Sequence, residues 1–167
     1  MTFTRSRPWM RLARSSTSGD FWCVNTSDGS TNWHFAVTTG SDKRIRSGAA
    51  LDANSTTVYF QCNNGLLYAL DAGSGAQRWT NYTGNVGGPP AASTFHTQPF
   101  SSSPVVGADG TVYVASSDGS VRAFNHSNGA QLWRVTTDKN TNAFQPFEAV
   151  VASQWVSILE CLDCDLA

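Results

Sequence analysis

The sequence is poor in charge and in long apolar runs. Only 14% of its 167 residues are charged, and just two lysines and two glutamates occur. The formal net charge of −1 implies no polyanionic partner, so nucleic-acid binding is not predicted. No run of 18 apolar residues is present, so no membrane span is predicted. Glycine, serine, threonine and asparagine are abundant, which favours short strands and tight turns over long helices.

Motifs for metal binding or catalysis are also missing. The three histidines are scattered without a ligand-pair spacing, and neither a Gly-x-Ser-x-Gly elbow nor a phosphate-binding loop occurs. Cys161 and Cys164 form one C-x-x-C, but a four-ligand zinc site needs a second pair. Incidental thiols are the favoured interpretation, and a redox pair is the alternative.

The two ends of the sequence differ from its middle. Residues 1–19 carry four arginines and no acid, a composition that matches a transit peptide in outline. No apolar core follows these arginines, so no secretory signal is predicted, and a disordered basic Ser/Thr-rich leader is favoured. Residues 137–167 contain no copy of the motif described next and are expected to form an irregular tail.

Residues 20–136 contain a tryptophan-centred motif that occurs three times without gaps. Each copy has a small residue, an apolar residue and Asp or Asn, then Gly four places later and Trp four places after that. The small residues are Cys23, Ala69 and Ala123, the Asp or Asn residues are Asn25, Asp71 and Asn125, the glycines are Gly29, Gly75 and Gly129, and the tryptophans are Trp33, Trp79 and Trp133.

The second and third copies extend upstream with the same offset, and each predicts four short strands. The turns between them contain Asn-Gly or Asp-Gly pairs, which suit tight hairpins. Each unit is therefore a small antiparallel meander, as in a propeller blade. The predicted strands are 49–52, 57–61, 66–71 and 76–80 in the second copy and 104–107, 111–116, 120–125 and 130–135 in the third. The predicted units are a half blade at 20–36 and full blades at 48–81 and 102–136.

Each motif position has a physical reason. The Asp or Asn side chain can accept backbone N–H groups and close the turn, and the Gly supplies a left-handed backbone position. The Trp side chain is too large to be buried within one four-stranded sheet. It is therefore expected to lie between its blade and the next, with its indole N–H donating a hydrogen bond to a carbonyl oxygen. The Ala keeps space for a neighbouring ring. Binding of a sugar or planar cofactor is the alternative, but three equivalent tryptophans favour packing.

The motif Ala69-x-Asp71-x-x-x-Gly75-x-x-x-Trp79, with its repeat ending at Trp133, resembles the tryptophan docking motif of PQQ-like, quinoprotein alcohol dehydrogenase-like β-propellers. The resemblance implies an all-β fold, a partial β-propeller of four-stranded antiparallel blades with irregular N- and C-terminal segments. Complete members have about seven or eight blades, and propellers in general at least four. Two and a half copies indicate a fragment, a truncated gene product or a protomer that completes a ring by association; a fragment is favoured.

The resembled family includes quinone-dependent dehydrogenases, cofactor-free scaffolds and accessory domains of larger enzymes, so the fold alone does not select among them. Catalysis with PQQ and calcium needs converging oxygen ligands and a carboxylate base. Residues 1–147 contain no glutamate, and Asp71, Asp109 and Asp118 all occupy turn positions.

The favoured function is therefore a non-catalytic scaffold or interaction module that needs no cofactor. Its expected partners are the remaining propeller blades or another protein. One alternative is a fragment of a PQQ-dependent alcohol or sugar dehydrogenase, with PQQ and calcium as cofactors. The other is an accessory propeller domain of a multidomain enzyme. The family resemblance favours an extracytoplasmic location.

Overall fold

The computed structural model describes residues 11–12, 18–83, 102–116, 120–136, 148–152 and 155–159. In these residues the chain forms strands, turns and loops without a helix, and every strand pair is antiparallel. The described part of the chain thus contains no helix able to cross a membrane. The all-β fold class predicted from the sequence is confirmed.

Three sheets follow one another along the chain, and we call them the first, second and third blade. The first has strand order β1-β2-β3, the second β4-β5-β6-β7 and the third β11-β10-β9-β8. The strands of the first blade are β1 (Arg11–Leu12), β2 (Asp20–Val24) and β3 (Thr31–Ala36). Those of the second are β4 (Ala49–Leu51), β5 (Thr57–Cys62), β6 (Leu66–Asp71) and β7 (Gln77–Tyr82). Those of the third are β8 (Val105–Val106), β9 (Val112–Ser116), β10 (Ser120–Phe124) and β11 (Gln131–Thr136).

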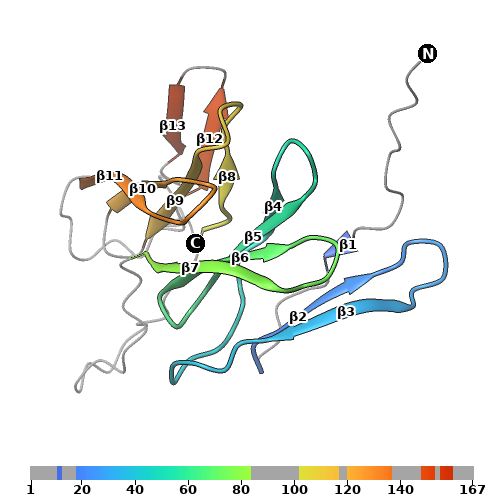
Figure 1. The fold of residues 1–167 in the computed structure, drawn as a ribbon. Coiled ribbons are helices and arrows are strands. Elements are labelled where there is room, and N and C mark those ends of the chain that lie inside the picture. The colour runs from blue at the N-terminus through green and yellow to red at the C-terminus, as the bar shows by residue number, and fades with distance from the viewer. Residues whose placement is uncertain are drawn as a thin grey trace, which may run out of the picture.

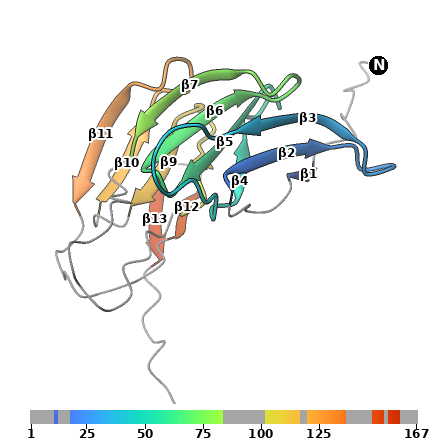
Figure 2. The same ribbon diagram turned by 90° about the horizontal axis from the view of Figure 1, so that it is seen from below.

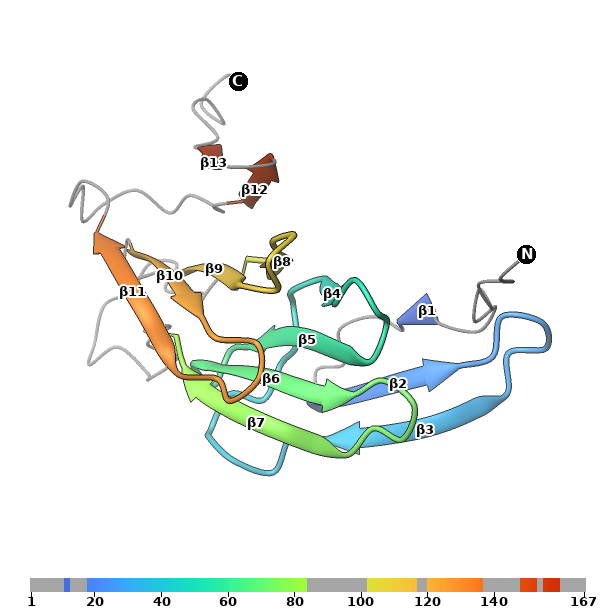
Figure 3. The same cartoon turned by 45° about the horizontal axis from the view of Figure 1, so that its top comes forward.

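The three blades lie side by side in a curved array, which we call the fan (Figure 1). The strands that carry the motif tryptophans, β3, β7 and β11, lie along the same side of the fan (Figure 2). A turned view places the first blade at one end, the second in the middle and the third beyond it (Figure 3). This arrangement of antiparallel meanders is that of consecutive blades in a propeller.

The second blade is covered on both faces, which explains its apolar sequence. All six residues of β5 are buried. Val58 and Phe60 belong to a cluster shared with the first blade, whereas Tyr59 belongs to a cluster shared with the third. Because successive strand residues point to opposite faces, burial on both sides removes the alternation of apolar and polar residues. The core of the molecule therefore lies in two layers between the blades.

Both predicted terminal segments contain short strands. β1 lies within the segment predicted as a leader and pairs with β2. A two-residue strand is too short to show a hydrophobic pattern in the sequence. It forms by pairing with the edge of β2. The predicted irregular tail contains a hairpin of β12 (Glu148–Ala152) and β13 (Trp155–Leu159). β12 contains two valines, β13 contains Trp, Val and Ile, and such a hairpin needs no tryptophan motif. Cys161 and Cys164 lie outside the described residues.

Candidate functional site

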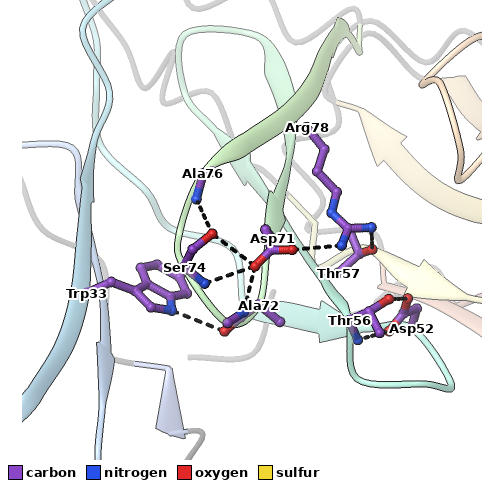
Figure 4. A network of polar contacts seen from close by, with 10 residues as sticks. Trp33, Asp52, Thr56, Thr57, Asp71, Ala72, Ser74, Ala76 and Arg78 are labelled. Atoms are coloured by element: carbon purple, nitrogen blue, oxygen red, sulfur yellow. Dashed lines mark hydrogen bonds and ion pairs between the residues drawn. The ribbon is translucent and has the colours of Figure 1, made fainter.

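The most distinctive sites are the contacts between a tryptophan on one blade and a turn of the next blade. We call each contact a seam, with a tryptophan side and a turn side. In the seam between the first and second blades, Nε1 of Trp33 donates a hydrogen bond of 3.0 Å to the carbonyl oxygen of Ala72 (Figure 4). The ring lies directly over Gly75: a Cβ there would be 2.6 Å from Cε3 of Trp33. The Trp33 residue is only 7% exposed.

The seam between the second and third blades repeats this geometry. Nε1 of Trp79 donates to the carbonyl oxygen of His126 at 2.8 Å, and a Cβ at Gly129 would lie 2.5 Å from Cε3 of Trp79. Trp79 is 8% exposed. Here Asn81 adds a bond of 2.6 Å from its Nδ2 to the carbonyl oxygen of Gly129. Two independent copies of the motif thus make the same contact, with the residue after Asp or Asn as acceptor.

The turn side is preformed by the Asp or Asn of the motif. Asp71 accepts hydrogen bonds from the backbone N–H groups of Gly73 and Ser74 at 3.0 and 2.9 Å (Figure 4). The N–H of Gly75 closes the turn on the carbonyl oxygen of Asp71 at 2.8 Å. Gly75 has a φ of 75°, a left-handed position that favours glycine.

The turns of the other two blades have the same construction. Asn25 accepts from the N–H of Ser27 at 3.0 Å, and Asn125 accepts from the N–H of Ser127 at 2.8 Å. Gly29 and Gly129 both have a φ of 73°. Three different stretches of sequence therefore present one shape of turn.

The small residue of the motif lies in the strand beside its own tryptophan. Ala69 is paired with Trp79 and with Tyr59 across the two neighbouring strands. The absence of a larger side chain at Ala69 leaves space between the two rings, whose centroids are 5.7 Å apart. The third blade has the same arrangement, with Ala123 paired with Tyr113 on one side and Trp133 on the other. In the first blade, Cys23 is paired with Trp33.

The third tryptophan has a different environment. Trp133 keeps the same strand position, and its ring lies 5.7 Å from that of Tyr113. Yet it is 40% exposed, and all six residues of β11 are exposed. Among the described residues, no carbonyl accepts a hydrogen bond from its indole N–H. The third copy of the motif thus presents the tryptophan side of a seam on the surface.

Gln61 makes a further link between blades that the motif analysis missed. Its Nε2 donates to the carbonyl oxygens of Ser102 and Ala115 in the third blade, at 3.0 and 3.2 Å. The residue is fully buried. A sequence signal was present, because Gln61 is a polar residue in the apolar run of β5 at the repeat position that Ala115 occupies in the next blade.

Two carboxylates are stabilised in their charged form. The side chain of Arg78 hydrogen-bonds Asp71 at 2.8 Å, and chiefly this bond lowers the pKa of Asp71 from 3.8 to about 2 (Figure 4). Asp42 is bonded by Arg44 beside it, which likewise lowers the pKa of that carboxyl to about 2. Both groups are therefore ionised in the folded protein at any pH above about 4.

These pKa shifts predict acid sensitivity. A carboxyl whose pKa is lower in the folded than in the unfolded chain stabilises the fold above its ordinary pKa, and this contribution is lost as the pH falls toward the folded value. We expect the melting temperature to fall between pH 4 and pH 2. Circular dichroism melting curves across this range test it, with Asp71→Asn flattening the dependence. An unchanged slope in Asp71→Asn contradicts the assignment.

Asp109 and His34 make local contacts. Asp109 accepts from the N–H of Thr111 at 2.9 Å and closes its own turn. His34 lies 2.7 Å from Asp20 and stacks on the ring of Trp22. In the part of the chain that the structure describes, no three His, Cys, Asp or Glu residues are grouped so that they could hold a metal ion. Asp118 lies outside the described residues.

Blades of three or four antiparallel strands with one Trp-and-turn seam between neighbours define a β-propeller of the PQQ-like class. The sequence matches the family model described as outer membrane protein assembly factor BamB, over residues 10–96 and 90–160. The chain belongs to this PQQ-like repeat family. No curated protein matches the sequence.

Solved structures share the fold. BamB from Moraxella catarrhalis is 17% identical with a TM-score of 0.69, and the match covers 93% of this chain and 44% of that one. Quinohemoprotein alcohol dehydrogenase from Comamonas testosteroni is 21% identical with a TM-score of 0.52, covering 72% of this chain and 18% of that one. The dihydro-heme d1 dehydrogenase NirN, in complex with DHE, is 10% identical with a TM-score of 0.63, covering 89% and 29%. The chain thus spans less than half of each of these proteins.

Proposed function

We propose that the chain is a non-catalytic segment of a PQQ-like propeller that acts as a scaffold or interaction module. The observation that carries this proposal is the exposed tryptophan side of a seam on the third blade. Trp33 and Trp79 are buried against a following turn, whereas Trp133 is 40% exposed at the same motif position. A preformed docking element on the surface suits association with further blades or another protein.

The state of the described carboxylates supports a structural role. Asp71, Asp109 and Asp52 each accept hydrogen bonds within their own turn or hairpin, from Ser74, Thr111 and Thr56. Carboxylates held in this way keep their charge at low pH and are weak general bases. The family description names outer membrane assembly, which favours an extracytoplasmic location for this chain as well.

The competing proposal is a segment of a quinone-dependent dehydrogenase, and cofactor binding separates the two. We expect no saturable binding when the purified chain is titrated with PQQ in the presence of millimolar Ca²⁺. Isothermal titration calorimetry and quenching of tryptophan fluorescence measure this, with EDTA as the metal-free control. Stoichiometric, calcium-dependent binding of PQQ would overturn the scaffold proposal in favour of the dehydrogenase.

A further inference from the structure

The first blade carries a complete turn side of a seam. The N–H of Gly29 closes on the carbonyl oxygen of Asn25 at 2.8 Å, as Gly75 and Gly129 do in their turns. A Cβ at Gly75 or Gly129 would meet a tryptophan ring within 2.6 Å, but a Cβ at Gly29 would meet none of the described residues within 4 Å. The turn Asn25–Gly29 therefore has the shape that receives a tryptophan and open space where the ring would lie.

The third blade carries the matching tryptophan side. β11 exposes all its residues, whereas the equivalent β7 buries its tryptophan against the next blade. Val135, two residues after Trp133 and on the same face, is 54% exposed and enlarges the apolar surface. Such a surface on an outer strand is suited to burial against another protein surface.

Trp133 and the Asn25–Gly29 turn of the same molecule cannot contact each other. The first and third blades lie at opposite ends of the fan, with the second blade between them (Figure 3). A second copy of the chain supplies both complements at once, because its first blade carries the turn and its third blade the tryptophan. The formal net charge of −1 per chain gives little repulsion between copies.

We propose that copies of this chain associate head to tail, with Trp133 of one copy docked on the Asn25–Gly29 turn of a second copy. By the register of the two internal seams, the acceptor of the indole N–H is the carbonyl oxygen of Thr26. The inference rests on the proposed scaffold function and names the partner as a second copy. Head-to-tail contacts of this kind form rings where the rotation closes.

The C-terminal hairpin agrees with this docking. β12 lies against β8 and β9, just as β8 lies against β4 of the preceding blade. The hairpin thus stands where the inner strands of a further blade would be (Figure 3).

Sedimentation velocity of the full chain between about 1 and 100 µM tests the proposal, because this concentration range detects association with a Kd in the micromolar range. We expect a concentration-dependent increase in mass for the wild type. Trp133→Ser removes the tryptophan side, and Gly29→Val fills the space above the turn, so each should weaken association at least tenfold. Leu132→Ser is the matched control, since Leu132 is similarly exposed on the opposite face of the same strand and its loss should leave association unchanged.

Mixing the two variants distinguishes a lost seam from a lost fold. The Gly29→Val chain retains Trp133, and the Trp133→Ser chain retains the turn, so an equimolar mixture should form a capped heterodimer although each variant alone is monomeric. A mixture that stays monomeric, or a wild type that is monomeric throughout, overturns the inference. A wild type that is monomeric and binds no quinone overturns the association but leaves the proposed scaffold function standing. Calcium-dependent PQQ binding overturns the scaffold function, whether or not the chain associates.

Discussion

Replacing Trp79 by alanine is expected to lower the free energy of unfolding by about 3–5 kcal/mol, the range for removing a large buried aromatic side chain. Three contacts of the Trp79 side chain disappear together. They are its packing on Gly129, its packing near the ring of Tyr59, and its hydrogen bond to the carbonyl oxygen of His126. The loss is large against a typical total stability of about 5–15 kcal/mol. Urea denaturation followed by circular dichroism measures it.

Two further variants separate the contributions. Trp79→Phe keeps a ring but leaves the carbonyl of His126 without its donor, so a loss of about 1–3 kcal/mol is expected. Trp133→Ala is the control at the same motif position, and we expect less than about 1 kcal/mol in dilute, unassociated protein because this ring is partly exposed. Equal losses at Trp79 and Trp133 would contradict the assignment of the seam as the stabilising contact.

The strands of the second and third blades could be predicted from sequence because the information is local. The predicted strand 66–71 coincides with β6, and 57–61 differs from β5 by one residue. Hairpins joined by Asn-Gly or Asp-Gly turns need only neighbouring residues to define them. The motif spacing predicted the order of the blades for the same reason, because it too depends only on residues close in sequence.

Contacts between blades could be predicted only in part from the same pattern, which placed each tryptophan between blades but did not identify the residues that its ring contacts. The spacing explained Gly75 by backbone conformation alone, but the structure adds that Trp33 of the preceding blade packs on it. Gln61 was missed because its partners are 41 and 54 residues away in sequence. Position in the repeat predicts equal roles for the three tryptophans, yet their burial depends on which blade follows. Local sequence therefore predicts the blade, and neighbouring blades decide how each seam is used.

Replacing Gly75 or Gly129 by alanine is expected to destabilise the chain by about 2–5 kcal/mol. An L-residue at a left-handed φ costs about 1–2 kcal/mol, and overpacking typically adds about 1–3 kcal/mol. Both positions have such a φ, and both place the new methyl group within 2.6 Å of a tryptophan ring. The ring or the turn must shift, so the indole hydrogen bond lengthens. Urea denaturation gives the free energies of unfolding.

Gly29→Ala is the matched control, because its turn is built in the same way and its φ is nearly equal, but no ring of the described residues lies above it. Only the backbone cost of about 1–2 kcal/mol is expected there. The excess loss at Gly75 therefore measures the packing of Trp33, and a double variant with Trp33→Ala should recover part of it, since residues in contact are not additive. Equal losses at all three glycines, or full additivity with Trp33→Ala, would show that the turns act through backbone conformation and that the seam contributes no packing energy.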